Sequence, residues 1–305
     1  DKGPVFDRCE FAHNGDDSMN IHGDFGRVIK REGSDRYYYL EGEYEAGDTI
    51  EFRDADSVAL LGKVKLRRVK KVTDGPEVAI NKKYSAKSDF LVEFDQALSL
   101  PELALVVMDG KRSNQGFVVK NCWIHDSFQR TLVNGSPGGL FKNTTWSNVG
   151  QGIRVQFETW GPWMEGPFAR DLTIKANRFF ESDIKVGMYP AGPVTSRSRV
   201  EAKPVTNMNI SGNYFSRNTK PPLYICNVDG LTVEEIRIDY PAESPKQKGL
   251  SDESRRNWLY LQDCENVVVT NNFIPGAAGV LTGNEPPEGD VALVFKTLRS
   301  LRLLG

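Results

Sequence analysis

The sequence predicts an all-β protein in which a parallel β-helix carries a small inserted antiparallel β-barrel. Three observations lead to this fold class. A short strand pattern recurs along the chain, a separate region holds short alternating strands, and no long helical periodicity interrupts them. The longest apolar runs, such as Leu103–Met108, are far shorter than the ~20 residues of a membrane span.

The repeated pattern is apolar-x-apolar-x-x-Asn-x-apolar. Its copies are FVVKNCWI, GLFKNTTW, LTIKANRFF, MNISGNYF and VVVTNNFI, and a sixth copy, VFDRCEF at 5–11, lacks the Asn. Asn121 and Asn143 in the first two copies lie 22 residues apart, within the repeat periods of solenoids. Alternation predicts that Val118, Ile174 and Ile210 share one buried column. The Asn residues suit turns because Asn tolerates the left-handed conformation and its amide bonds to backbone.

The pattern changes over residues 26–112, where runs such as YYYLEGEY, DTIEFRD and DFLVEFD are separated by turn signals. Frequent turns between alternating strands are typical of an antiparallel barrel. We therefore expect one β-helix coil at 1–25, the barrel-like insertion at 26–112, and the remaining coils at 113–305.

Composition excludes some functions. The chain has 39 basic and 41 acidic residues, a net charge of −2 that argues against a dedicated nucleic-acid binder. No nucleotide-binding or serine-hydrolase motif occurs, and none of the three histidines is paired at i, i+4 as zinc ligands often are. We expect no metal and no cofactor.

The first candidate site lies in CEFAHNGDDSMNIHG, residues 9–23, which contains Asp16 and Asp17. Glycoside hydrolysis needs one carboxylic acid to protonate the leaving oxygen and a carboxylate on the other side of the sugar. Adjacent strand residues face opposite sides, so a partner carboxylate from a coil about 9.6 Å away would fit this role better than a simple pair. The structural alternative is a turn or a calcium-binding surface loop.

The second candidate site is QFETWGPWMEGPFARD, residues 156–171, where Trp163 lies near Glu158 and Glu165. A tryptophan can stack on a sugar and the acids can accept bonds from its hydroxyls. The alternative is a loop folded over its own aromatic residues. Arg130 and Arg154, in the preceding coils, would hold a hydroxyl or neutralise the acids, or be ordinary surface arginines.

Taken together, these segments resemble glycoside hydrolase family 110, the α-1,3-galactosidases. The resemblance rests on the DD-x-x-N-x-HG signature at 16–23, YEAGDTIEFRD, FQRTLVNGSPGG and WMEGPFARDLTIKANRF. It implies a right-handed β-helix with inserted barrels, and removal of terminal α-linked galactose with inversion and without a cofactor. Asp16 and Asp17 match the family's acidic pair, and the acid and the base are not distinguished between them.

The resemblance also implies a substrate-binding set. These residues are Asn20 and His22 in the signature, Arg130 in the pocket wall, and Trp163 and Glu165 in the W-x-E-G-P loop. Glu158 joins them because it lies in the same segment, 156–171, as Trp163 and Glu165. The substrate is a galactose-terminated glycan, and we expect a secreted or periplasmic location. The family has further coils upstream, which predicts another carboxylate before Asp1. Two alternatives stay open: another β-helix enzyme, either polygalacturonase-like or a calcium-dependent lyase, and a non-catalytic glycan-binding β-helix.

Overall fold

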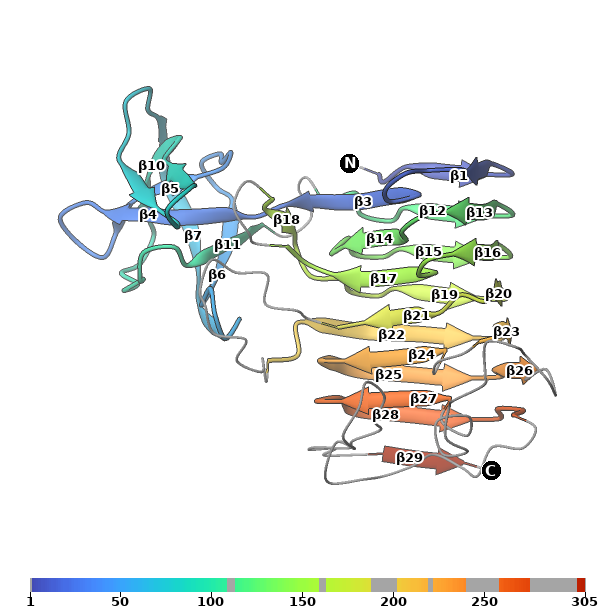
Figure 1. The fold of residues 1–305 in the computed structure, drawn as a ribbon. Coiled ribbons are helices and arrows are strands. Elements are labelled where there is room, and N and C mark those ends of the chain that lie inside the picture. The colour runs from blue at the N-terminus through green and yellow to red at the C-terminus, as the bar shows by residue number, and fades with distance from the viewer. Residues whose placement is uncertain are drawn as a thin grey trace.

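The computed structural model describes residues 2–108, 113–158, 163–187, 202–218, 222–239 and 258–274, and the backbone of 301–304. Every regular element within these residues is a β-strand. The strands form three stacked sheets with parallel pairing and a separate closed barrel (Figure 1). The all-β class, the parallel coils and the barrel are confirmed, whereas the handedness of the coil stays a prediction.

Each coil contributes one strand to each of three sheets, named here A, B and C. Sheet A contains β1 (Val5–Asp7), β12 (Val118–Lys120), β15 (Leu140–Lys142), β19 (Thr173–Lys175), β22 (Val205–Ser211), β25 (Val228–Glu234), β28 (Glu265–Thr270) and β29 (Leu301–Leu304). Sheet B contains β2 (Glu10–Ala12), β13 (Trp123–Ser127), β16 (Thr145–Val149), β20 (Arg178–Phe180), β23 (Tyr214–Ser216) and β26 (Arg237–Asp239). Sheet C contains β3 (Met19–Asp24), β14 (Thr131–Asn134), β17 (Ile153–Gln156), β21 (Ile184–Val186), β24 (Leu223–Cys226) and β27 (Leu259–Gln262), with β18 (Glu165–Gly166) antiparallel to β3.

Strict register builds the core of the β-helix. In sheet A, Val119 pairs with Phe141, and the column continues through Ile174 and Ile210, all fully buried. The prediction that Val118 belongs to this column is wrong by one position, because Val119 takes that place. Val118 pairs with Leu140 and is only half-buried. Three consecutive apolar residues at 117–119 made the alternation ambiguous, and a shift by one residue reverses the face of every side chain.

The repeated Asn residues fall into two columns rather than one. Asn121 (φ 55°) and Asn143 (φ 50°) occupy the left-handed position that ends each strand of sheet A, and Asn143 donates to Asn121 Oδ1 at 2.8 Å. Asn177, Asn213 and Asn272 lie one position later, where Asn177 and Asn213 are buried. Both roles are turn chemistry, as expected, but the alignment of all five Asn in one column is wrong.

The inward Asn residues replace backbone partners at the corner between sheets A and B. Asn213 Oδ1 accepts from the backbone N–H of Asn177 at 3.0 Å, and its Nδ2 donates to the carbonyl of Ile174 at 2.8 Å. Asn177 Oδ1 does the same for the N–H of Thr144 at 2.9 Å. A buried corner has no water to satisfy these groups, so the amides stabilise the turns of successive coils.

The inserted barrel closes in the order β10-β5-β4-β11-β6-β7 with antiparallel pairing throughout. Its strands are β4 (Gly26–Arg31), β5 (Tyr37–Glu41), β6 (Thr49–Arg53), β7 (Leu60–Lys71), β10 (Phe90–Phe94) and β11 (Leu105–Met108), and a hairpin of β8 (Glu77–Ala79) and β9 (Ser85–Lys87) lies beside it. Tyr38, Phe52 and Phe94 fill its interior without exposure. Closure leaves the six strands without a free edge.

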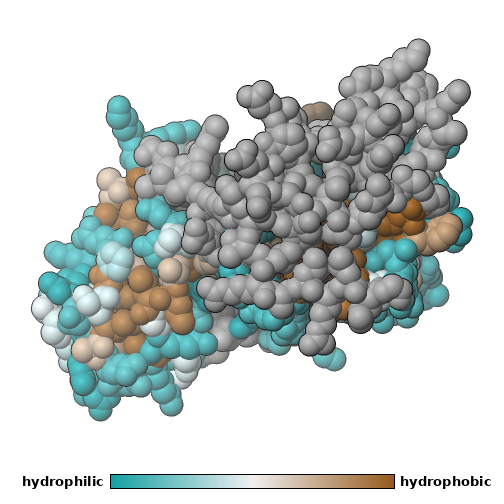
Figure 2. Space-filling model, turned by 90° about the horizontal axis from the view of Figure 1, so that it is seen from below, coloured by the Kyte–Doolittle hydropathy of each residue, from teal (hydrophilic) through white to brown (hydrophobic). Residues whose placement is uncertain are grey.

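The barrel is joined to the β-helix through β3, which leads directly into β4 (Figure 1). An aromatic cluster packs this junction, because Phe25 between the two strands contacts Phe157 and Phe168 with ring centroids 5.9 and 5.4 Å apart. Figure 2 shows hydrophobic residues gathered on the underside of the barrel within a hydrophilic surround. Among the described residues there is no helix that could span a membrane.

The two Asn columns predict different costs of substitution. Asn213→Ala leaves a buried N–H and a buried carbonyl without partners, and we expect it to lower the free energy of unfolding by about 3 kcal/mol. Asn143→Gly is the control, because glycine adopts the left-handed conformation at this exposed site and its cost is below about 1 kcal/mol. Urea unfolding compares the two variants, and equal costs would contradict the distinction between the columns.

Candidate active site

Asp17 and Arg130 meet because β3 and β14 are in register. Met19 pairs with Thr131, and the Ser18 N–H donates to the Arg130 carbonyl at 2.8 Å, so the residues just before both strands lie side by side. Arg130 Nε lies 3.2 Å from Asp17 Oδ1. The two atoms are not aligned as a hydrogen bond requires, so the contact is an ion pair.

The environment of the Asp17 carboxyl favours its neutral form more than water does. Burial raises its pKa to about 6, and the negative charges of Asp16, Glu158 and Glu165 act in the same direction. The Arg130 guanidinium lowers this pKa but does not outweigh burial. Asp16 is exposed, and its negative charge acts on the site by raising the pKa of Asp17. Of the two adjacent acids, Asp17 therefore has the environment of a proton donor.

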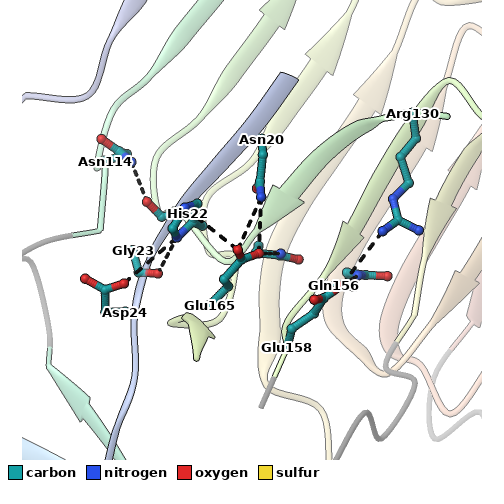
Figure 3. A network of polar contacts seen from close by, with 10 residues as sticks. Asn20, His22, Gly23, Asp24, Asn114, Arg130, Gln156, Glu158 and Glu165 are labelled. Atoms are coloured by element: carbon teal, nitrogen blue, oxygen red, sulfur yellow. Dashed lines mark hydrogen bonds and ion pairs between the residues drawn. The ribbon is translucent and has the colours of Figure 1, made fainter. Parts of the chain in front are cut away.

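Glu158 contacts the same guanidinium. Arg130 Nη2 is 3.8 Å from Glu158 Oε1, and Gln156 Nε2 donates to the same oxygen at 2.6 Å (Figure 3). Arg154 Nε in turn donates to Gln156 Oε1 at 3.0 Å, which fixes the amide. Burial raises the pKa of Glu158, and the charge of Glu165 adds to the effect.

Glu165 is held by side chains of the first two coils. Asn20 Nδ2 donates to its oxygens at 3.2 and 3.4 Å, Asn134 donates to Oε2, and His22 Nε2 lies 3.9 Å from Oε1. Figure 3 shows Asn20 and His22 both directed at this carboxylate. Amide donors on two strands fix the position of Glu165, and a protonated His22 would add an ion pair.

The loop that carries the two glutamates folds back onto sheet C. Glu158 and Glu165 exchange two backbone hydrogen bonds, at 2.9 and 2.8 Å, so their side chains leave the same face. The loop can approach β14 closely because Gly135 (φ 76°) has no Cβ, which would otherwise overlap the Pro167 carbonyl. This approach places Glu165 against Asn134.

Trp163 opens onto a cavity of about 310 Å³ between the β-helix and the barrel. Its side chain is 45% exposed, and the cavity is also lined by His22 and Glu165 and, from the barrel, by Gly42 and Tyr44. The neighbouring Phe157 and Phe168 are buried in the junction instead. The loop therefore buries two of its aromatic rings and exposes Trp163, whose stacking on a sugar stays a prediction.

The structure brings Asp17, Asn20, His22, Arg130, Glu158 and Glu165 together, with Trp163 at the edge. The sequence reasoning missed Asn134 and Gln156, the last residues of β14 and β17, which pair in register with one another and, through Asn134, with His22 of β3. An alignment of the three strands in register would have predicted them, because it places both residues in one column with His22. In the described part of the chain, no three His, Cys, Asp or Glu side chains converge as metal ligands would.

Comparison with known proteins finds distant relatives. The chain is 23% identical over 293 residues to α-1,3-galactosidase A of Bacteroides fragilis, covering 89% of this chain and 44% of the relative. It is 24% identical over 272 residues to α-1,3-galactosidase A of Bacteroides thetaiotaomicron (85% and 44%) and 20% identical over 283 residues to α-1,3-galactosidase B of that organism (88% and 43%). The chain spans less than half the length of these relatives, whose names agree with the family that the sequence resembles.

No family model matches the chain. Among solved structures, a tailspike of Pseudomonas phage phi297 matches with a TM-score of 0.23 and 10% identity, over 90% of this chain and 53% of that chain.

The electrostatic account of Asp17 predicts opposite shifts in two variants. Arg130→Gln removes the neighbouring positive charge and raises the pKa of Asp17 above about 6. Asp16→Asn removes a negative charge and lowers it. The carboxyl carbon of Asp17, followed by ¹³C NMR against pH, measures both. Shifts of the same sign would show that the neighbouring charges do not act as described.

Proposed function

We propose that this chain carries the active site of a glycosidase that removes terminal α-1,3-linked galactose with inversion. The observation that carries the proposal is the Arg130 guanidinium, which contacts both Glu158 and Asp17, the acid whose pKa burial raises to about 6. The names of the relatives support galactose as the substrate. A secreted or periplasmic location belongs to the same proposal.

In this mechanism Asp17 is the general acid and Glu158 the general base. Asp17 donates its proton to the glycosidic oxygen as the bond from that oxygen to the anomeric carbon breaks. Glu158 takes a proton from a water whose oxygen bonds to the opposite face of that carbon, so an α-galactoside yields β-galactose. A raised pKa suits the acid, and turnover falls as the pH rises above about 6 because Asp17 then loses its proton.

Arg130 joins the two carboxyls in these roles. Its contacts limit the separation of one Asp17 oxygen and one Glu158 oxygen to roughly 9 Å or less, a range that includes both the ~6.5–9.5 Å of inverting glycosidases and the ~5 Å of retaining ones. Arg130 also places a positive charge beside both acids. Glu158, the base, comes from a loop that follows β17, which is the coil-to-coil arrangement expected for the partner of Asp17.

The remaining polar groups would bind the sugar. Glu165 is fixed by Asn20 and Asn134 and offers acceptors to galactose hydroxyls, while His22 lies 3.9 Å from the same carboxylate. The next sugar would enter the cavity beside Trp163, whose exposed ring offers an apolar face. Asp16 and the predicted carboxylate before Asp1 have no assigned step in this mechanism.

The proposal is tested by proton NMR of the protein mixed with α-1,3-galactobiose. We expect β-galactose as the first product, and Asp17→Asn should lower kcat about a hundredfold or more because no side chain then protonates the leaving oxygen. Asp16→Asn is the matched control, since Asp16 is exposed, and it should retain kcat within about tenfold.

Each other outcome contradicts a stated part of the proposal. Initial release of α-galactose would contradict inversion, and equal losses in the two variants would remove the acid role from Asp17. An unsaturated product that absorbs in the ultraviolet would indicate a lyase. Absence of galactose release would contradict the galactosidase itself.

A further inference from the structure

A second and larger cavity, of about 880 Å³, lies on the corner between sheets B and C. Five successive coils line it, here represented by Asn14, Phe128, Gln151, Ser182 and Arg217. Stacked coils repeat every ~4.8 Å, so the cavity is a groove that follows the axis of the β-helix for about 19 Å. We name it the corner groove; its length suits an extended chain rather than a single small molecule.

The corner groove follows from how each coil turns between the two sheets. One residue per coil adopts the left-handed conformation, including Asp126 (φ 47°), Asn148 (φ 53°) and Arg217 (φ 62°). The coils pack closely just behind this bend, where a Cβ on Gly150 would overlap the carbonyl of Phe128. A sharp bend repeated in register therefore gives a continuous hollow along the corner.

The lining is polar and nearly balanced in charge. The described lining residues include three acids and two bases, namely Asp126, Glu181, Asp183, Lys185 and Arg217. Lys185 Nζ pairs with Asp183 Oδ2 at 3.3 Å. Such a lining offers donors and acceptors without the strong field that a polyanion would require.

Several buried polar atoms in the lining have no hydrogen-bond partner among the described residues. They include Gln151 Oε1, Ser182 Oγ and Asp183 Oδ1, and Ser182 is only 2% exposed. Buried polar groups are ordinarily satisfied, by protein, by water or by a ligand. The hydroxyls of a sugar both donate and accept hydrogen bonds, which suits these atoms.

At the edge of the same groove, Phe128 is 75% exposed, the most exposed of the large hydrophobic side chains in the described residues. An aromatic ring beside amides and hydroxyls provides the two surfaces that a sugar presents, an apolar ring face and a polar rim. Phe128 also stands two residues before Arg130, so the corner groove adjoins the acidic site without sharing Asp17, Arg130 or Glu158.

We propose that the corner groove binds the internal units of a neutral, linear oligosaccharide chain. Phe128 stacks on one sugar ring, and Gln151 and Ser182 bond to hydroxyls of the units beside it. The inference does not rest on the galactosidase assignment, since it uses none of the proposed catalytic residues.

The test uses a neutral linear hexasaccharide of alternating galactose and N-acetylglucosamine without an α-galactose cap. Calorimetry should show binding to the protein, and Phe128→Ala should raise the Kd about tenfold because the apolar ring face loses its partner. Trp163→Ala is the matched control in the other cavity and should leave this Kd unchanged. In NMR, the backbone signals of Gly150 and Gln151 should shift on binding.

Three results would overturn the inference. They are no binding of the hexasaccharide, a Kd unaffected by Phe128→Ala, and tighter binding of a sulfated hexasaccharide than of the neutral one. Turnover of α-1,3-galactobiose by Phe128→Ala separates the two proposals: we expect it to be unchanged, because the disaccharide is too short to span both cavities.

Discussion

The in-register stacking of parallel strands is the constraint from which the rest of this structure follows. Each ladder of backbone hydrogen bonds forces residues at the same position of successive coils into one column. Inward columns bury the hydrophobic core, and columns at the corners select residues that tolerate left-handed backbone or satisfy buried amides. Outward columns collect polar residues that are far apart in sequence, such as His22, Asn134 and Gln156, which makes a site possible.

Stacking alone does not complete that site. The loop after β17 returns to β3 as β18, and it supplies Glu158 and Glu165 over the face that the columns have prepared. The aromatic cluster around Phe25 packs Phe157 and Phe168 of this loop against the barrel, so the barrel supports the loop that carries these acids. Burial of Asp17 in this site, with a smaller contribution from the neighbouring carboxylates, raises its pKa to about 6.

The fold class was predictable because two periodicities in the sequence differ so clearly. The register of the strands was less predictable. Three consecutive apolar residues, Phe117–Val119, allow either face of the strand to point inward, so Val118 was assigned to the wrong face. Asn suits both the left-handed position and the buried position of the turn, so Asn177 was assigned to the wrong column. The signature residues Asp17, Asn20 and His22 could be predicted to lie near one another because they are close in sequence. Asn134 and Gln156 were missed because their role depends on which coil stacks on which, and a single sequence does not show this before the coils are aligned.

A crystal structure of the Asp17→Asn variant soaked with α-1,3-galactobiose would show whether Asp17 faces the bond that is cleaved. We expect the terminal galactose on the outer face of sheet C among Arg130, Glu158 and Glu165. Its glycosidic oxygen should lie within hydrogen-bond distance, about 3 Å, of the side chain at position 17. A disaccharide bound with this oxygen directed away from position 17, or bound only elsewhere on the molecule, would contradict it.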